Sequence, residues 1–131
     1  MVSKERHVVL FGTFDGVHDG HRDLFRQARA FGGRLTVIIA RDLMVLRLKH
    51  QVPKLAERIR HDIVKGEELV DAAAFGDSEL SVYHTLKELN PDIICLGYDQ
   101  QKLGADLKIQ LGESVKGGEK LYRQGGEKLY H

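Results

Sequence analysis

Short, continuously apolar runs alternate along this chain with segments whose apolar residues recur every three or four positions. The runs predict buried strands at 7–11, 35–40, 70–75 and 92–96. The periodic segments predict helices at 22–31, 41–49, 55–69, 79–89 and 101–111. Strands that are apolar on both faces and alternate with helices form a parallel sheet with helices on both sides. The pattern therefore predicts an α/β protein, with a doubly wound, open parallel sheet in a single domain.

Two loops of this predicted sheet are candidate ligand sites. In open parallel sheets, ligands bind beyond the carboxyl ends of the strands, where the strand order reverses. The loop at 12–19 follows the first predicted strand, and the loop at 97–100 follows the fourth. We therefore look for chemistry in these two loops.

Composition narrows the class of protein. The chain has 131 residues, enough for one domain, and 42% of them are hydrophobic, too many for a disordered chain. The 20 basic and 19 acidic residues leave a net charge of +1, so we expect no binding to nucleic acid. No apolar run approaches the roughly 20 residues of a membrane span, and no membrane association is expected. The single cysteine, Cys95, and the lack of a secretory leader favour a cytoplasmic protein.

The loop after the first strand has the composition of a phosphate-binding loop. It reads GTFDGVHDGH from Gly12 to His21. Its glycines let the backbone approach a ligand closely, and His18 and His21 stand where the next helix begins. A helix N-terminus presents free N–H groups and a positive dipole, which suit a phosphate, and imidazole N–H groups would add donors. This arrangement is typical of phosphoryl or nucleotidyl transfer.

Two other interpretations of this loop remain open at the level of sequence. The histidines could simply cap the helix, which is the usual role of isolated polar side chains at such a position. Alternatively, Asp15, His18, Asp19 and His21 could hold a metal ion, although their spacing matches no zinc pattern. Neither the Walker phosphate loop nor the dinucleotide glycine fingerprint is present.

The loop resembles the G-T-F-D-x-x-H-x-G-H motif of the cytidylyltransferase-like nucleotidyltransferases, which include glycerol-3-phosphate cytidylyltransferase and archaeal FAD synthetase. The resemblance continues at lower specificity from about residue 8 to residue 100. Ala40-Arg41-Asp42 is similar to the family's A-R-D, and the LGYDQ run at 96–100 is similar to the archaeal FAD synthetase branch. The resemblance implies a Rossmann-like nucleotidyltransferase fold and a nucleotidyltransferase activity.

The resemblance also implies roles for individual residues. In the family, the motif histidines stabilise the α- and β-phosphates of the nucleotide, and a lysine after the second strand contacts phosphates. Lys49 is the best match for that lysine, and Lys54 matches less well. The implied catalytic residues are His18, His21 and Lys49. The implied nucleotide-binding residues are Gly12, Thr13, Phe14, Asp15, Gly20, Asp99 and Arg123, and no residue is assigned to a metal.

One family feature has two candidate matches. The family carries a Glu-Arg pair at the start of the helix that follows the lysine. Glu57-Arg58 matches the pair literally, but the spacing from Val70-Asp71 places the arginine at Arg60. The two arginines cannot be distinguished from the sequence. Asp99 follows a buried strand at the predicted switch point, where it could hold a ribose hydroxyl or an acceptor group.

The C-terminal segment departs from the family. Its members usually end with a fifth strand and an Arg/Lys-Thr-Ser motif, whereas the only threonines here are Thr13, Thr36 and Thr85. Residues after 112 lack the apolar alternation of a buried strand, and GGEKLY occurs twice, from Gly117 and from Gly125. We therefore divide the chain into a domain at 1–112 and a tail at 113–131. The tail is either a flexible or engineered appendage, or a segment that orders by docking on a neighbour.

The predicted helix at 41–49 is unusually apolar. Leu43-Met44-Val45-Leu46 is either ordinary core or a surface for self-association, since exposed apolar patches mark interfaces. From this patch and the dimeric habit of the family, we expect a homodimer.

Two functions follow from these observations. The first is an enzyme that transfers CMP or AMP from CTP or ATP to a small phosphorylated acceptor and releases pyrophosphate, with Mg²⁺ bound to the nucleotide. The second is a catalytically impaired or redesigned protein on the same fold that acts as a nucleotide binder or a self-assembling scaffold. The complete histidine motif favours the enzyme, and the unusual tail favours the alternative.

Overall fold

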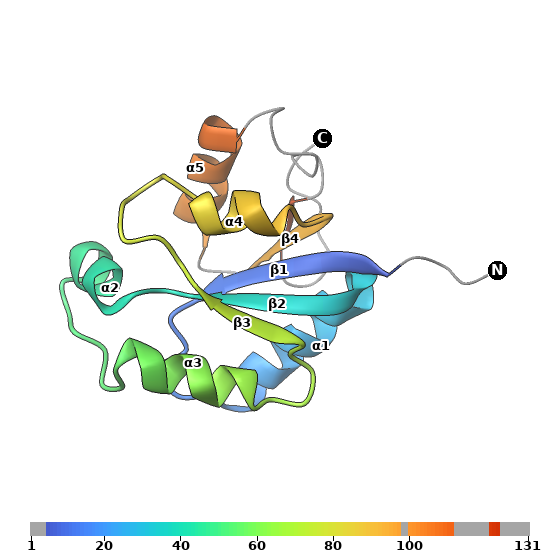
Figure 1. The fold of residues 1–131 in the computed structure, drawn as a ribbon, viewed down its shortest axis with the longest axis horizontal. Helices are drawn as coiled ribbons and strands as arrows, with labels where there is room; N and C mark the ends of the chain where they lie inside the picture. Colours follow the sequence, from blue (N-terminus) through green and yellow to red (C-terminus); the bar gives the residue numbers. More distant parts are fainter. Residues whose placement is uncertain (1–4, 98–99, 112–120, 124–131) are drawn as a thin grey trace.

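The computed structural model describes residues 5–97, 100–111 and 121–123 (Figure 1). Its strands form one parallel sheet in the order β3-β2-β1-β4-β5. The elements in chain order are β1 (Arg6–Gly12), α1 (Asp19–Gly32), β2 (Gly33–Ile39), α2 (Asp42–Lys49), α3 (Glu57–Lys65), β3 (Ala72–Phe75), α4 (His84–Leu89), β4 (Ile93–Leu96), α5 (Gln101–Leu111) and β5 (Leu121–Arg123). The predicted α/β class and parallel sheet are thus confirmed.

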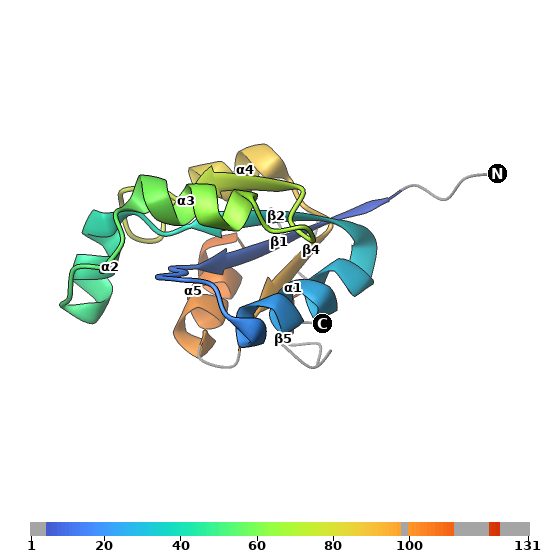
Figure 2. The same cartoon turned by 90° about the horizontal axis from the view of Figure 1, so that it is seen from below.

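Helices cover both faces of the sheet (Figures 1 and 2). Alternate side chains of a strand point to opposite faces, so each continuously apolar strand supplies two cores. Val8 and Leu10 of β1 pack with residues of α1 and α3 on one face. Val9, between them, packs with residues of α4 and α5 on the other. The fully apolar strands of the sequence therefore reflect burial from both sides.

The strand order reverses at β1. From β1 the chain continues to β2 and β3 on one side, and then crosses to β4 and β5 on the other. The ends of β1 and β4 therefore lie side by side at the carboxyl edge of the sheet, with Leu10 paired to Cys95. This is the edge at which a ligand is expected in an open parallel sheet. The two loops selected from the sequence begin here, at Gly12 and Gly97.

Two helices begin later than predicted because a distant aspartate, Asp15 or Asp106, holds the preceding loop in a non-helical conformation. The backbone N–H groups of Lys54 and Leu55 donate to the Asp15 carboxylate, at 2.7 and 2.8 Å, so α3 begins only at Glu57. Ser81 and Tyr83 have left-handed φ values of 61° and 57°, so no helix runs from residue 79, and α4 begins at His84. In both places a tertiary contact prevails over helical periodicity.

The sheet has a fifth strand that the sequence analysis did not expect. β5 lies parallel to β4, with Ile94, Cys95 and Leu96 paired to Leu121, Tyr122 and Arg123. The expectation that the tail stays outside the sheet is therefore wrong for these three residues. Apolar alternation was the wrong criterion, because backbone N–H and C=O groups alone can add a strand to an open edge.

The apolar run in α2 serves three environments. Val45 is buried in the protein, Met44 lines a pocket described below, and Leu43 and Leu46 are exposed. The run is therefore neither entirely core nor entirely surface. The homodimer expected from it stays a prediction. Across the described residues, no helix is both long and apolar enough to span a membrane.

The fifth strand leads to a prediction about stability. We expect deletion of 117–131 to lower the melting temperature by about 5 °C, because three paired residues contribute on the order of 1–2 kcal/mol. Thermal unfolding followed by circular dichroism measures this. A truncation after Arg123, which retains β5, is the matched control. Equal melting temperatures for the two truncations would show that β5 contributes nothing to stability.

Candidate active site

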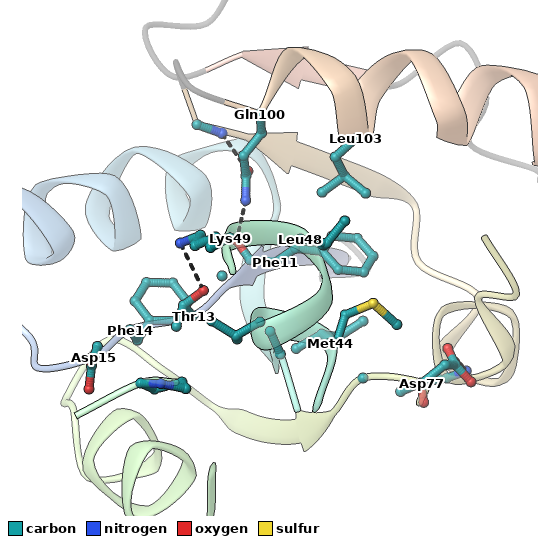
Figure 3. Close-up of a pocket in the computed structure, with 18 of the residues that line it drawn as sticks. Phe11, Thr13, Phe14, Asp15, Met44, Leu48, Lys49, Asp77, Gln100 and Leu103 are labelled. Atoms are coloured by element: carbon teal, nitrogen blue, oxygen red, sulfur yellow. Dashed lines mark hydrogen bonds between the residues drawn. The ribbon is translucent and has the colours of Figure 1, made fainter. Parts of the chain in front are cut away.

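A pocket of about 670 Å³ opens at the carboxyl edge of the sheet (Figure 3). Its walls come from the loops after β1 and β3, from α2 and the loop that follows it, and from Gly97 and Gln100 before α5. The pocket thus reaches both faces of the sheet. Phe14 belongs to the core beside α1, whereas Phe11 and Tyr83 pack against the core beside α4 and α5. Both loops selected from the sequence contribute to this pocket.

The loop after β1 is shaped by the ring of Phe14. Phe14 has a left-handed φ of 52°, and its buried ring packs 5.5 Å from Phe25 and 5.2 Å from the imidazole of His21. A Cβ atom on Gly12 would lie 2.4 Å from this ring, so only glycine fits there. The phenyl ring therefore sets the direction in which the loop leaves β1. It also packs against the imidazole of His21.

The two motif histidines form the start of α1 through reciprocal hydrogen bonds. The Nδ1 atom of His18 accepts from the backbone N–H of Gly20 at 3.0 Å, and the Nδ1 atom of His21 accepts from the backbone N–H of His18 at 3.3 Å. The rings stack at 3.9 Å between centroids. This arrangement is a capping box in which imidazoles replace the usual Ser and Glu. The prediction that these histidines cap the helix is therefore confirmed, and the cap uses only one nitrogen of each ring.

The caps also determine which ring nitrogen carries the proton. Because each Nδ1 atom accepts a hydrogen bond, each neutral ring carries its hydrogen on Nε2. Both rings line the pocket, so they can offer Nε2–H groups to a ligand there. A Cβ atom on Gly20 would lie 2.9 Å from Cε1 of His18, so glycine lets that ring keep its present position. Capping and ligand binding thus use different nitrogens of the same side chains.

The environment keeps His21 neutral. Burial lowers the pKa of His21 below its usual value, and the nearby imidazole of His18 lowers it further. The hydrogen bond from the His18 N–H also favours the neutral form of His21, because it needs an unprotonated Nδ1 atom on that ring. At neutral pH His21 is therefore a neutral donor through Nε2.

A cation lines the same pocket as the histidines. The Nζ atom of Lys49, at the end of α2, donates to the Thr13 hydroxyl at 3.2 Å (Figure 3). Both residues line the pocket, and the Lys49 side chain is exposed to solvent. The lysine is thus placed beside the loop by a neutral partner, and among the described residues it forms no ion pair. An anion in the pocket could therefore contact both Lys49 and the histidines.

The position of Thr13 depends on a buried arginine. The fully buried guanidinium of Arg60 donates to the carbonyl oxygens of Thr13 and Leu55, at 2.7 and 2.9 Å. It also forms a 2.7 Å ion pair with Asp42 at the start of α2. Arg58, the literal match to the family pair, is exposed. The structure therefore places the buried, loop-holding arginine at position 60.

Asp42 and Glu57 lock the starts of two helices together. The Asp42 N–H donates to the Glu57 carboxylate at 2.9 Å, and the Glu57 N–H donates to the Asp42 carboxylate at 3.2 Å. Each carboxylate therefore caps the other's helix, where an acidic side chain is favoured by the helix dipole. Arg41 completes the cluster with a 2.9 Å ion pair to Glu57. These contacts hold α2, and with it Lys49, against α3.

On the opposite wall, Asp106 of α5 holds the loop after β3. The hydroxyls of Ser81 and Tyr83 both donate to the Asp106 carboxylate, the former at 2.7 Å. Burial, together with this carboxylate, raises the pKa of Tyr83 well above its usual value. The Tyr83 hydrogen bond in turn lowers the pKa of Asp106. The left-handed turn at Ser81 and Tyr83 is thus stabilised by an ionised carboxylate.

Gln100 joins the two central strands at the edge of the pocket. Its amide nitrogen donates to the Phe11 carbonyl of β1 at 2.8 Å, and its amide oxygen accepts from the Gly97 N–H at 2.8 Å (Figure 3). Sequence analysis included Gln100 in the similar LGYDQ run but gave it no role. A side chain that spans β1 and β4 could be identified only once those strands were known to be neighbours.

Known proteins resemble this chain in both sequence and structure. A family model described as Cytidylyltransferase-like matches residues 9–114. The chain belongs to the cytidylyltransferase-like family. It is a nucleotidyltransferase enzyme, as the sequence analysis predicted.

Relatives and a solved structure agree with this family. The FAD synthase of Methanococcoides burtonii is 44% identical over 107 residues, which cover 81% of this chain and 72% of the relative. The FAD synthase of Methanosarcina acetivorans is 46% identical over 111 residues, which cover 85% and 70%. The crystal structure of a lipopolysaccharide core biosynthesis protein from Thermoplasma volcanium superposes with a TM-score of 0.82 at 29% identity, covering 96% of this chain and 99% of that one.

The enzyme's predicted site residues largely converge on the pocket. Those that line it are Gly12, Thr13, Phe14, Asp15, His18, His21 and Lys49. Gly20 lies behind the His18 ring rather than among the lining residues, and Asp15 is occupied with the N–H groups of Lys54 and Leu55. Asp99 lies outside the described residues, and of Arg123 only the backbone, in β5, is described. The nucleotide-binding roles of these residues stay predictions.

Other residues at this pocket were not assigned a role from the sequence. Met44 and Leu48 of α2, Leu103 of α5 and the loop residues Val52 and Leu80 form an apolar part of the wall. The sequence did contain a signal for this wall. Helix α2 has more apolar residues than are needed for the one face that packs on the core, and the additional ones line the pocket. Among the residues that the structure describes, no three His, Cys, Asp or Glu side chains are grouped closely enough to hold a metal ion.

The buried arginine gives a stability prediction for the enzyme. We expect Arg60→Met to lower the free energy of unfolding by about 3–5 kcal/mol, because it leaves a carboxylate and two carbonyl groups without their partner. Urea unfolding measures this change. Arg58→Met, two residues away on the exposed side of the helix, should stay within about 0.5 kcal/mol of the wild type. Equal effects for the two variants would contradict the assignment of Arg60.

The lowered pKa of His21 gives a pH dependence. The unfolded chain, with imidazole pKa values near 6.5, binds more protons than the folded chain as the pH falls. The free energy of unfolding therefore decreases from about pH 6.5 downward, through the lowered pKa. Burial also lowers the pKa of His7, so His7 likewise reduces the free energy of unfolding as the pH falls. In urea unfolding at pH 7 and pH 5, His21→Asn should lose less stability than the wild type over this range, and an unchanged loss would exclude His21 as a source.

Proposed function

We propose that this enzyme transfers AMP from ATP to FMN, forming FAD and pyrophosphate. The observation that carries the proposal is the pair of stacked imidazoles at the start of α1, whose Nδ1 atoms accept from backbone N–H groups so that Nε2 can donate to the nucleotide's phosphates. The printed name of the relatives, FAD synthase, supports ATP and FMN in particular, because FAD consists of FMN joined to AMP.

In the proposed reaction an oxygen of the FMN phosphate attacks the α-phosphorus of ATP in line. A bond forms between that oxygen and the α-phosphorus, while the bond from the α-phosphorus to the bridging oxygen of pyrophosphate breaks. The attacking phosphate is already anionic, so the reaction needs no protein base. The protein's task is to position the two phosphates and to stabilise the charge that develops between them.

The side chains of the pocket suit this task. His18 and His21 donate through Nε2 to oxygens of the α- and β-phosphates, and the positive end of the α1 dipole favours the same anion. Lys49 supplies a positive charge and exchanges its Thr13 partner for a phosphate oxygen. The Lys49 cation offsets part of the negative charge of the triphosphate, and the two imidazoles donate hydrogen bonds to its oxygens. Asp99 and Arg123 stay candidates for contacts to the nucleotide.

A divalent cation accompanies the nucleotide in this proposal. In this proposal the phosphates themselves carry the ion into the site. Mg²⁺ suits phosphate oxygens, keeps several of its waters, and would offset charge on the leaving pyrophosphate. Omission of Mg²⁺ is therefore part of the assay below.

The proposal is tested by assaying FAD formation with purified protein. ATP, FMN and Mg²⁺ should give FAD and pyrophosphate, detected by chromatography, while CTP in place of ATP should give at most slow transfer. Transfer from CTP to another phosphorylated acceptor would overturn the choice of nucleotide and acceptor but leave nucleotidyl transfer intact. Nucleotide binding with no transfer to any acceptor would instead support the catalytically impaired alternative.

The catalytic role of the histidines can be separated from their capping role. An Asn side chain places its oxygen where histidine has Nδ1, but it has nothing at the position of Nε2. We therefore expect His18→Asn to keep the helix cap and the melting temperature, while turnover falls by about 10²-fold, the typical cost of losing one transition-state donor.

The other variants complete this comparison. His18→Ala should lose both the cap and the turnover, and His21→Asn should lose turnover with little loss of stability. Steady-state kinetics and thermal unfolding are measured on the same preparations. Turnover like that of the wild type in either Asn variant would remove that histidine from the proposed mechanism and leave it as a cap alone.

A further inference from the structure

An apolar rim borders the pocket on the side of α2 and the loop after β3. We define it as Met44, Leu48, Val52 and Leu80, all of which line the pocket. Three of them are strongly exposed: Leu48 at 62%, Val52 at 69% and Leu80 at 51%. Figure 3 shows Leu48 and Met44 pointing from α2 into the pocket. Large apolar side chains gathered at the mouth of a pocket, rather than scattered over the surface, mark a ligand contact.

The rim and the phosphate-binding groups are different surfaces of the same pocket. Lys49 directly follows Leu48 in α2, and it turns instead to Thr13 of the loop after β1. Successive residues of a helix point in directions about 100° apart, so α2 presents an apolar and a cationic surface to the same pocket. A ligand held by its phosphate near Lys49 therefore has its remaining part beside the rim.

We propose that the rim binds the isoalloxazine ring of the acceptor through its dimethylbenzene edge, and so selects a flavin phosphate over other phosphorylated acceptors. This inference rests on the proposed function. Of the two ring systems in the reaction, only the flavin has an edge made entirely of carbon, whereas adenine carries nitrogen around its rings. Leucine, methionine and valine offer no hydrogen bonds to ring nitrogens, but they match methyl groups well.

The loop that carries Leu80 is held in place for such a contact. The neighbouring Ser81 and Tyr83 donate to Asp106 of α5, which holds the loop in its left-handed turn. On the other side, the Lys54 N–H donates to Asp15, which fixes the loop two residues after Val52. Both loop residues of the rim are therefore positioned before the ligand arrives, which lowers the entropic cost of binding.

The test compares rim variants with a matched control in steady-state kinetics of FAD formation. Leu48→Gln keeps a helix-forming residue, and Val52→Thr keeps the shape of the side chain while adding a hydroxyl. Ile109→Gln is the control, because Ile109 is 77% exposed on α5 and does not line the pocket. The acceptors are FMN and an FMN analogue that lacks the two ring methyl groups.

We expect Leu48→Gln to raise the KM for FMN about tenfold and Val52→Thr to raise it about threefold, with the KM for ATP and kcat unchanged. The demethylated analogue should have a raised KM with the wild type and should respond less to the same substitutions. The Ile109→Gln control should match the wild type with both acceptors.

The possible failures are distinguishable. If the wild type forms FAD but both rim variants keep its KM for FMN, the rim does not bind the flavin. A rise in the KM for ATP instead would place the adenine there and overturn the inference, although FAD synthesis would stand. A wild type that forms no FAD from ATP and FMN would overturn the proposed function and, with it, the assignment of the rim to a flavin.

Discussion

The buried guanidinium of Arg60 joins the three segments on which the polar wall of the pocket depends. A charge withdrawn from water costs several kcal/mol unless it is paired and hydrogen-bonded. Here the pairing is complete only when Asp42 of α2, the Leu55 carbonyl and the Thr13 carbonyl all surround it. Because losing any of these partners would leave the buried charge less well compensated, the loop after β1 and the start of α2 are held at one relative position. Lys49 and Thr13 meet as a consequence.

The histidines show how one side chain can serve structure and chemistry together. An imidazole has two nitrogens on opposite sides of the ring, and the cap uses only Nδ1. The cap is what orients Nε2, so the capping and the donor roles support each other rather than compete. Stacking of the two rings and burial of His21 disfavour a positive charge there. The pocket therefore offers an anion preoriented Nε2 donors from the two rings, together with the cation of Lys49.

Much of the fold and part of the site could be predicted from local sequence. Apolar runs and helical periodicity depend on near neighbours in the chain, and they predicted the order of nine of the ten elements. The GTFDGVHDGH loop is also local, and His18, His21 and Thr13 lie together because they are few residues apart. Local periodicity also gave a wrong prediction. Residues 79–83 have the spacing of a helix, but Asp106, distant in sequence, holds Ser81 and Tyr83 in a left-handed turn.

The sequence by itself determined the α/β class, the loop that carries the histidines and the resemblance to a nucleotidyltransferase family, because each of these is written in contiguous residues. Only the tertiary structure decided between Arg58 and Arg60, added β5 to the sheet, and gathered Met44, Leu48, Val52 and Leu80 at one pocket. These outcomes depend on residues that are far apart in the chain and become neighbours only when helices, loops and strand edges pack together. Burial and hydrogen-bond partners arise at that step, and no pattern along the chain contains them.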